Sequence, residues 1–452
     1  MRRLAFFLMY YVLLVISVTA GFLYSPSVAE PAFHGWVPSL NVLPSLILLP
    51  LAMVAGLRIS NLPFVSRTKS RTDQVIQIAV GLLLGIFSFQ LLRALATAVL
   101  VDRYVHLIAF VSGFCLVFAS RLASRAINGH YARRILIFGS KASFTRFQHA
   151  HLQRGENDYI LVGYYDPTPI QVEPELEPAA VNFKHGGLFE YCVLQSIDDV
   201  VVEFGEGICP EVSQSLMFCT SQGINVMETT AFFEKYLECV HEASLDERWF
   251  WGFDPAHLHP FYSAFKRCLD IGVSLVGIVA FLPLAPFVAL AIKLQDGGPV
   301  LYSQTRTGLH NRTFKILKFR TMRVDAENSG AQWAADKDAR ITWLGTFLRR
   351  SRIDEVPQFW NILLGDMSFV GPRPERPEMI ERIEKDIKFY KFRHLIKPGL
   401  TGWAQINYPY GASVEDAQRK LSYDFYYLKY ASPFLDIMII MRTFVAMARG
   451  AR

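Results

Sequence analysis

Two adjacent carboxylates, Asp354 and Glu355, stand in the segment Ser351–Asn361 beside a group of arginines. The arginines are Arg349, Arg350 and Arg352. An ionised, positioned aspartate can attack phosphorus as a nucleophile, as in aspartyl-phosphate enzymes. Mg²⁺ prefers carboxylates together with substrate phosphates, and arginine makes forked contacts with phosphate oxygens. These residue types therefore predict phosphate chemistry.

The apolar spacing after the pair predicts a short helix that has Asp354 as its N-cap and ends near Gly365. Asp is a good N-cap, and Pro357 is tolerated in a first helical turn. The positive end of such a helix would keep both carboxylates ionised and favour a bound phosphate. An isolated Asp-Glu pair is usually only a capped helix with a solvated acidic start. The prediction of chemistry therefore depends on the surrounding motifs.

Further motifs accompany the pair in a fixed order. They are Lys318-Phe319-Arg320-Thr321-Met322, Arg340-Ile341-Thr342 with Leu348-Arg349-Arg350, Val370-Gly371-Pro372-Arg373-Pro374-Glu375, and Lys397-Pro398-Gly399-Leu400-Thr401-Gly402-Trp403. Together with the pair, the set resembles the bacterial sugar transferases, which are monotopic polyprenyl-phosphate hexose-1-phosphate transferases. The resemblance covers roughly residues 260–452. Upstream, only the layout is similar to that of the long members of the family.

The resemblance implies a reaction in which a UDP-sugar and a polyprenyl (undecaprenyl) phosphate give a polyprenyl-diphospho-sugar and UMP. Asp354 would form a covalent phospho-sugar intermediate, which the lipid phosphate would then displace. Glu355 would support Mg²⁺ or proton handling, so both carboxylates are expected metal ligands. Such an enzyme initiates the synthesis of an exopolysaccharide, a capsule or an O-antigen. By analogy, the chain could form a homodimer.

Six other side chains are expected to bind the substrates: Lys318, Arg320, Arg349, Arg352, Arg373 and Asp424. Lys318 and Arg320 would lie on one face of a strand, two residues apart. Pro372 and Pro374 push the backbone around Arg373 toward an extended form, so this side chain has little entropy to lose on gripping phosphate or uridine. Asp424 lies in a segment that resembles the family's terminal helix and is expected to support the metal or sugar site.

The composition limits the class of protein. The chain has 452 residues, of which 52% are hydrophobic and 19% charged, with a formal net charge of +6. These values indicate a membrane protein of about three domains. The positive charge suits anionic lipid and diphosphate substrates, and no nucleic-acid partner is expected. The six cysteines show no Cys-x-x-Cys pattern and are expected to be unpaired and mostly buried.

Four apolar runs occupy the first quarter of the chain, at about 4–24, 37–57, 75–101 and 104–123. Each is long enough to span a bilayer. The loop at 25–36 has no Lys or Arg, whereas the loop at 58–71 carries Arg58, Arg67, Lys69 and Arg71. The positive-inside rule then places both ends of this region in the cytoplasm. We expect a transmembrane region of four helices at 1–128 in a multi-pass protein of the bacterial inner membrane, with the catalytic domain facing the cytoplasm.

Residues 129–247 are expected to form a Rossmann-like α/β domain, because strands and helices alternate. The strands are predicted at 134–139, 160–166, 199–204 and near 224–227, with a helix near 210–222. The first turn, Gly139-Ser140-Lys141-Ala142-Ser143, lacks the Gly-x-Gly-x-x-Gly pattern. This difference argues against dinucleotide binding and favours a structural or regulatory role.

Residues 248–452 are expected to form the catalytic domain, also α/β. It opens with an apolar run that Pro283 and Pro286 interrupt, and basic residues on both flanks favour the same side of the membrane. We interpret 266–294 as a re-entrant helix–break–helix, as in the family's membrane hairpin. Its freed backbone groups would need partners inside the protein. The expected fold is thus a membrane α-helical bundle, a Rossmann-like α/β domain and an α/β catalytic domain with a re-entrant membrane hairpin.

Two other functions remain open. The first is a membrane scaffold or sensor whose transferase module is inactive. The intact Asp354–Glu355 pair and the full arginine set argue against it. The other is a glycosyltransferase with an Asp-x-Asp metal site at Asp336 and Asp338, which would release UDP instead of UMP. No residue identifies the sugar.

Overall fold

The computed structural model describes residues 2–23, 43–59, 71–96, 103–127, 133–154, 159–165, 187–203, 210–241, 245, 247–251, 259–324, 326, 338, 340–408, 411 and 413–448. The chain divides into two compact units, Met1–Tyr236 and Leu237–Arg452. The predicted loop at 25–36, residues 60–70 of the predicted loop at 58–71, Cys209 and Asp336 lie outside the described residues.

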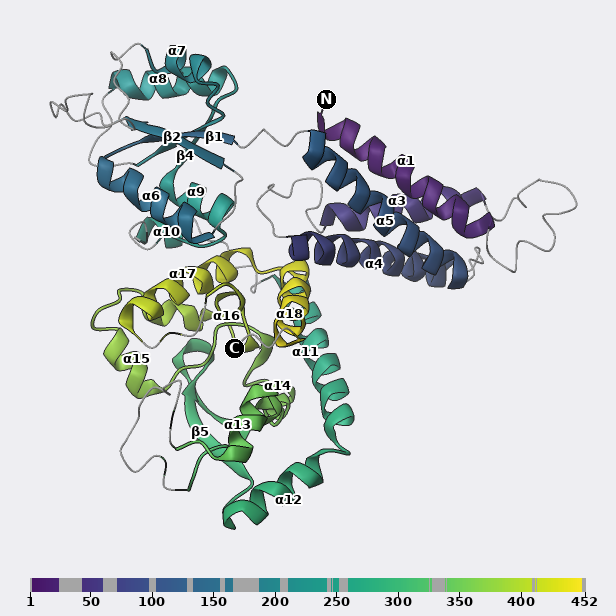
Figure 1. Ribbon diagram of the computed structural model, residues 1–452, viewed down its shortest axis with the longest axis vertical. Helices are drawn as coiled ribbons and strands as arrows, with labels where there is room; N and C mark the ends of the chain where they lie inside the picture. Colours follow the sequence, from purple (N-terminus) through teal and green to yellow (C-terminus); the bar gives the residue numbers. More distant parts are fainter. Residues whose placement is uncertain are drawn as a thin grey trace, which may run out of the picture. The chain divides into compact units, whose positions relative to one another are not determined.

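Four helices begin the first unit: α1 (Arg2–Leu23), α3 (Leu43–Ile59), α4 (Arg71–Ala96) and α5 (Arg103–Ile127). They correspond to the four predicted apolar runs and lie side by side (Figure 1), around a core that includes Leu14, Met53 and Leu82. Within the described residues, no single helix is both long and apolar enough to be a candidate membrane span. The prediction of a membrane bundle is therefore not confirmed.

The second part of this unit is a parallel four-stranded sheet with strand order β2-β1-β3-β4. Its elements are β1 (Arg133–Phe138), α6 (Lys141–Arg154), β2 (Tyr159–Tyr165), α7 (Leu188–Leu194), β3 (Asp199–Val202), α8 (Pro210–Ser221), β4 (Asn225–Glu228), α9 (Thr229–Phe232) and a π-helical turn (Phe233–Leu237). Helices α7 and α8 cover one face and α6 and α9 the other (Figure 1). The predicted α/β alternation is confirmed.

Of the six cysteines, the five that the structure describes are free. Cys192 and Cys219 are buried, whereas Cys115 and Cys268 are exposed. The expectation that the cysteines are mostly buried is therefore wrong for this second pair. Both exposed cysteines lie on apolar helices, α5 and α11, where a thiol behaves as a small hydrophobic side chain.

The second unit contains α10 (Glu247–Trp251) and then α11 (Pro260–Phe281) and α12 (Ala285–Asp296), which meet at a bend of 65° (Figure 1). By length and composition this bent pair could be a broken span or a re-entrant loop. The break lies at Pro283, one of the two prolines predicted to interrupt the run, whereas Pro286 lies in the first turn of α12. The amides on either side of it still donate, Leu282 to Ile278 at 2.8 Å and Leu284 to Phe281 at 2.9 Å. Pro283 has no N–H to leave unpaired, so few backbone groups are freed.

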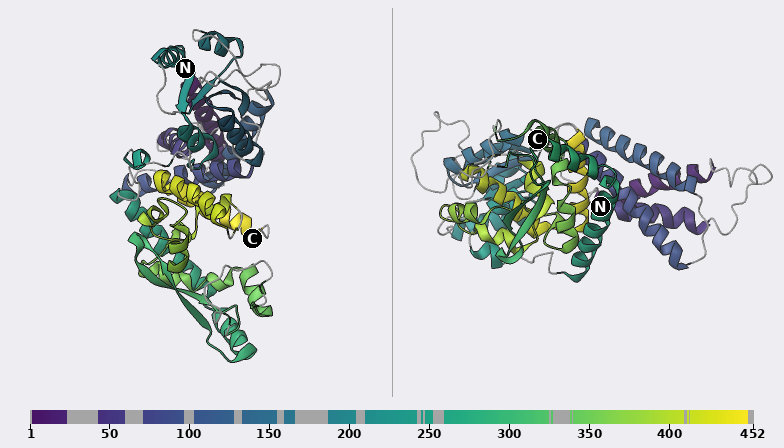
Figure 2. Two further views of the ribbon diagram at one scale, coloured as in Figure 1. Left: turned by 90° about the vertical axis from the view of Figure 1, so that its left-hand side faces the viewer. Right: turned by 90° about the horizontal axis from the view of Figure 1, so that it is seen from below.

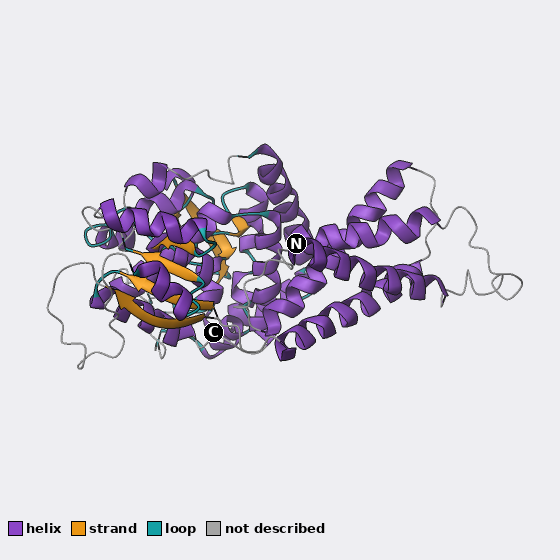
Figure 3. Cartoon of the chain, turned by 90° about the horizontal axis from the view of Figure 1, so that it is seen from above, coloured by secondary structure: helices purple, strands orange, loops and turns teal. Residues whose placement is uncertain are grey.

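The rest of the unit contains two small sheets (Figure 2, Figure 3). Strands β5 (Leu301–Thr307) and β6 (Thr313–Phe319) form an antiparallel hairpin, and β7 (Ser368–Val370) pairs in parallel with β8 (Gly399–Thr401). The helices are α13 (Trp343–Arg350), α14 (Gln358–Leu364), α15 (Pro377–Ile383), α16 (Trp403–Asn407), α17 (Val414–Tyr430) and α18 (Pro433–Ala448). Three 3-10 turns lie at Leu309–Asn311, Ile353–Glu355 and Tyr390–Leu395.

Polar contacts fix the base of α11 to this framework. Arg267 donates to the carbonyls of Ile362 and Leu363 in the last turn of α14, both at 2.7 Å. Asp270 is buried and accepts from the Ser368 hydroxyl at 2.9 Å and the Phe369 amide at 2.7 Å. Because buried polar groups are costly unless paired, these contacts hold the hairpin at one position relative to α14 and β7.

A small side chain is required where α13 crosses the chain after β6. A Cβ atom added at Gly345 would overlap the Thr321 carbonyl, which is backbone and cannot easily move. We expect Gly345→Ala to cost about 1–3 kcal/mol of stability and to lower the Tm of the purified protein.

Gly272 on α11 is the matched control, because a Cβ there meets nothing within 4 Å. Gly272→Ala should leave the Tm unchanged or raise it, since alanine favours helix more than glycine does. Equal Tm values for Gly345→Ala and the wild type would contradict the predicted overlap.

Candidate active site

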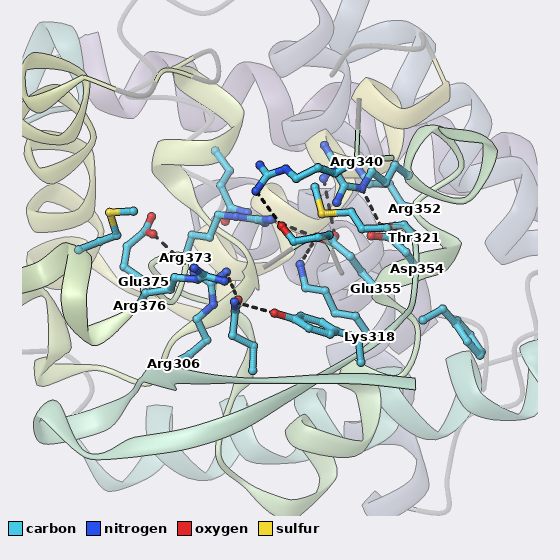
Figure 4. A pocket seen from close by; sticks show the side chains of 18 of the residues that line it. Arg306, Lys318, Thr321, Arg340, Arg352, Asp354, Glu355, Arg373, Glu375 and Arg376 are labelled. Atoms are coloured by element: carbon cyan, nitrogen blue, oxygen red, sulfur yellow. Dashed lines mark hydrogen bonds and ion pairs between the residues drawn. The ribbon is translucent and has the colours of Figure 1, made fainter. Parts of the chain in front are cut away.

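A cavity of about 640 Å³ lies within the second unit (Figure 4). Its wall is formed mainly by β5, β6, the turn before α14, the segment before α15, and the helices α16 and α17. Among the described residues that line it, eleven are basic: Arg306, Lys318, Arg320, Arg323, Arg340, Arg349, Arg352, Arg373, Arg376, Arg393 and Lys420. Four are acidic: Asp354, Glu355, Glu375 and Asp424. This excess of positive charge favours an anionic ligand.

Asp354 and Glu355 lie together in the 3-10 turn between α13 and α14. The prediction that Asp354 is the N-cap of a helix is wrong, because α14 begins only at Gln358, after Pro357. Arg352 adopts a left-handed backbone with φ 57°, which turns the chain and starts the 3-10 turn instead. The helix does end at Gly365, as predicted, with φ 94°. Both carboxylates are consequently buried rather than solvated.

Three cations surround the Glu355 carboxylate (Figure 4). Arg373 lies at 3.2 Å, Lys318 at 3.6 Å and Arg352 at 3.7 Å from its oxygens. Burial raises the pKa of Glu355, but the charges of these three side chains outweigh that effect and lower the pKa to about 2. Glu355 is therefore a fixed negative charge at neutral pH.

Asp354 comes directly before Glu355 in the chain, but its carboxyl group has a different environment. Burial and the neighbouring Glu355 charge raise the pKa of Asp354 to about 6. Its Oδ1 is buried and has no hydrogen-bond partner among the described residues. Two adjacent carboxyl groups with opposite pKa shifts are typical of sites in which each has its own role.

The remaining predicted cations also line the cavity. Arg349 donates from Nε to the Thr321 hydroxyl at 2.9 Å. Arg320 lies just beyond the end of β6 and pairs with Asp296. The Nη1 of Arg320 is buried and has no partner within the described part of the chain. The structure thus brings Lys318, Arg320, Arg349, Arg352 and Arg373 to one cavity.

Residues 261–450 match the family described as bacterial sugar transferase. A UDP-glucose:undecaprenyl-phosphate glucose-1-phosphate transferase from Xanthomonas campestris pv. campestris is 31% identical over 354 residues, which are 74% of this chain and 72% of that protein. The chain belongs to the bacterial sugar transferase family. The predicted resemblance is confirmed.

Other members of the family match a shorter region. A UDP-N-acetylgalactosamine-undecaprenyl-phosphate N-acetylgalactosaminephosphotransferase from Aeromonas hydrophila is 44% identical over 191 residues, which are 42% of this chain and 45% of that protein. A UDP-glucose:undecaprenyl-phosphate glucose-1-phosphate transferase from Escherichia coli (strain K12) is 39% identical over 180 residues, 39% of each protein. The chain therefore spans less than half the length of these two relatives.

Asp424, which was expected to support the metal or sugar, lies on α17 at the cavity wall. It is buried, and its Oδ2 accepts from Arg393 Nε at 3.0 Å and from Nη2 at 2.7 Å. The hydrogen-bond partner that the structure shows for Asp424 is thus Arg393.

The Asp-x-Asp pattern is not assembled as a metal site in the described part of the chain. Asp338 accepts from Arg340 Nε at 2.8 Å and from Nη2 at 2.6 Å. This hydrogen-bonded pairing lowers the pKa of Asp338 to about 2. Among the described residues, no group of three or more His, Cys, Asp or Glu side chains is placed to hold a metal ion.

Sequence reasoning did not assign six basic residues of this cavity to the site: Arg306, Arg323, Arg340, Arg376, Arg393 and Lys420. Tyr302, Gln304 and Arg306 follow one another at every second position of β5, and all three line the cavity. The period-2 pattern of a strand could have found Arg306. Arg393 lies in the irregular segment around Tyr390–Leu395, where no periodicity indicates which side chains face inward.

In the α/β domain, Gly139 lies at the edge of the sheet between β1 and β3, where strand order reverses. Rossmann folds bind phosphates at such a point. Here the Glu203 carboxylate lies there and contacts the Ser143 hydroxyl and Arg146. A carboxylate in this position would repel a dinucleotide phosphate, which supports the hypothesis of a structural or regulatory domain.

The opposite pKa shifts of the two carboxyls predict opposite effects on stability. A folded pKa of about 6 for Asp354, against an ordinary value of 3.8, penalises folding above pH 6. Asp354→Asn should therefore stabilise the protein at pH 8 by about 1–3 kcal/mol, and the gain should vanish as the pH falls from 6 to 4.

Glu355→Gln is the matched control with the opposite sign. The folded pKa of Glu355, about 2, is below its ordinary 4.5, so its charge stabilises the fold above pH 4.5. Removing that charge should lower stability at pH 8. Unfolding curves at pH 8, 6 and 4.5 measure both effects. A destabilising Asp354→Asn at pH 8 would contradict the assigned environment.

Proposed function

We propose that this protein transfers a sugar-1-phosphate from a UDP-sugar to a polyprenyl phosphate, such as undecaprenyl phosphate, and releases UMP. One observation carries the proposal: a buried aspartate, whose Oδ1 has no hydrogen-bond partner among the described residues, lies beside a glutamate held by three cations in a cavity of net positive charge. The names of the relatives describe transferases of this type, for glucose or N-acetylgalactosamine donors.

The proposed reaction has two steps on one phosphorus atom. The Asp354 carboxylate attacks the phosphorus next to the sugar, and the bond from this phosphorus to the bridging oxygen breaks, so that UMP leaves with that oxygen. An oxygen of the polyprenyl phosphate then attacks the same phosphorus and displaces Asp354. One phosphoanhydride is broken and one is formed, so no other energy source is required. Arginine and lysine side chains stabilise the charge that builds up on the phosphate oxygens.

A pKa of about 6 is compatible with this role, because the Asp354 carboxyl is still mostly ionised at neutral pH and can act as a nucleophile. Fixed positive charge lies close by: Lys318, Arg349 and Arg352 all lower the pKa of Asp354 against the effect of burial. Glu355 contacts Arg373, Lys318 and Arg352 and so orients all three beside Asp354.

We propose Mg²⁺ as the cofactor, and the residues present fit it in part. Mg²⁺ is commonly held by one or two carboxylates together with substrate phosphates. Asp354 fits this description, because its Oδ1 has no partner among the described residues. Glu355 already contacts three cations, so we expect it to ligate the metal less directly. The bound ion would neutralise charge on the diphosphate.

We propose the bacterial inner membrane, facing the cytoplasm, as the location of the cavity. Large apolar side chains of the hairpin are exposed in the second unit: Val276, Val279, Leu282, Phe287, Leu290 and Leu294. Trp343 and Phe347 on α13 and Trp360 and Leu364 on α14 are also exposed. Exposed apolar patches mark interaction sites, and tryptophan is favoured at the membrane interface. These features support a re-entrant hairpin beside the carboxylates, where a lipid phosphate would arrive.

The test is nucleotide release by the detergent-purified protein, supplied with undecaprenyl phosphate, Mg²⁺ and a panel of UDP-sugars. We expect lipid-dependent UMP from one or a few donors. Asp354→Asn should reduce turnover by about 10³-fold or more while remaining folded, and Lys388→Met, at an exposed ion pair with Glu247, should leave it unchanged. Release of UDP would contradict the proposal, as would full activity of Asp354→Asn.

A further inference from the structure

The segment Pro372–Glu375 is held by its carbonyl groups. Each of four consecutive carbonyls accepts a hydrogen bond: Pro372 from the Gly399 amide at 2.9 Å, Arg373 from Arg393 Nη2 at 3.2 Å, Pro374 from Arg306 Nη1 at 3.1 Å, and Glu375 from the Thr307 amide at 2.9 Å. Two of the four residues are prolines and have no N–H. The segment can therefore be fixed mainly through its acceptors, and two of the donors are arginine side chains.

The position and contacts of Arg393 suit it to hold this segment. It is only 4% exposed, and it lies against Asp424, which is 2% exposed. Its Nε and Nη2 donate to Asp424, its Nη1 donates to the Tyr390 hydroxyl at 2.9 Å, and its Nη2 also donates to the Arg373 carbonyl. A guanidinium has five N–H groups, and four of them are used in these contacts. Only one N–H group of Arg393 therefore remains to contact a substrate.

The held segment presents Arg373 to the reactive pair. The side chain of Arg373 reaches Glu355 at 3.2 Å, and its charge is the largest of those that lower the pKa of Glu355. The backbone of Arg373 and its side chain thus connect the buried pair Arg393–Asp424 to the carboxylates. A small shift of a phosphate-binding group can cost about 10²-fold in rate.

We propose that Arg393, with Asp424 as its counter-ion, is a positioning residue that fixes Arg373 through its backbone carbonyl. Asp424 then neutralises a buried arginine, instead of binding the metal or the sugar. The kinetic part of this inference rests on the proposed function, whereas the structural part does not. The informative variant is Arg393→Lys, because lysine keeps the charge beside Asp424 but cannot reach Asp424, Tyr390 and the Arg373 carbonyl together.

The first measurement is hydrogen–deuterium exchange of the purified full chain. In Arg393→Lys, the amides of Gly399 and Thr307, which donate to the Pro372 and Glu375 carbonyls, should exchange at least about threefold faster than in the wild type, because opening of a segment sets the exchange rate of the amides bonded to it. Peptides from the second half of α17 should not change. Unchanged exchange of the Gly399 and Thr307 amides would overturn the inference, whether or not the protein has the proposed activity.

The second measurement is a double-mutant cycle in kcat/KM for UMP release. We expect Arg393→Lys to lose about tenfold or more in the wild-type background and less than about twofold in Arg373→Ala, because the loss acts through Arg373. Arg267→Lys is the matched control. It also removes arginine contacts to backbone carbonyls, but to those of α14, so its effect should be the same in both backgrounds.

If the losses in kcat/KM caused by Arg393→Lys and Arg373→Ala multiply in the double variant, the two residues act independently. That result would overturn the inference and make Arg393 a direct substrate ligand. Asp424→Asn should show the same pattern as Arg393→Lys, with a smaller loss. A wild-type protein that releases no UMP would contradict the proposed function, and the exchange measurement would then decide the positioning role alone.

Discussion

The contact of Glu355 with three cations is the interaction on which the rest of the site depends. Lys318 comes from β6, Arg352 from the residue that starts the 3-10 turn, and Arg373 from the segment between β7 and α15. Without Glu355, these positive groups would repel one another in a partly buried space. With it, they are fixed around a single charge, and the adjacent Asp354 is buried with an Oδ1 that has no partner among the residues that the structure describes.

The framework supports this contact with backbone-directed hydrogen bonds. Asn361 on α14 donates to the Lys315 carbonyl at 2.8 Å and accepts from the Leu317 amide at 3.0 Å, which fixes the strand that carries Lys318. Arg267 joins the apolar hairpin to the end of the same helix. The segment that is proposed to enter the membrane and the carboxylates that are proposed to react are therefore parts of one rigid unit. Under the proposed function, this rigidity would let a lipid phosphate meet Asp354 in a constant orientation.

The sequence predicted much of this arrangement. The alternation of strands and helices predicted the parallel sheet, and Pro283 predicted the break between α11 and α12. The motif order predicted the family and brought Lys318, Arg349, Arg352 and Arg373 into one proposed site, where the structure places them. These predictions depend on local rules: strand periodicity, the missing proline N–H, and charge of one sign gathered near a carboxylate.

Other features could not be predicted, because tertiary contacts override local preference. Arg352 adopts a left-handed backbone that a non-glycine residue rarely takes, so the expected N-cap at Asp354 became a 3-10 turn. The role of Asp424 depends on Arg393, which lies in an irregular segment without a pattern. The four apolar runs did form helices, but none qualifies as a membrane span within the described residues, and the predicted membrane bundle is not confirmed.

The central claim is that Asp354 is the nucleophile, and trapping its intermediate tests this most directly. The protein would be mixed with Mg²⁺ and the preferred UDP-sugar without any polyprenyl phosphate, quenched in acid and digested for mass spectrometry. The account predicts a burst of at most one UMP per protein and a sugar-phosphate mass on the peptide that contains Asp354, both absent in Asp354→Asn. If UMP forms only when the lipid phosphate is present and no adduct is found, the lipid attacks the donor directly and the account is wrong.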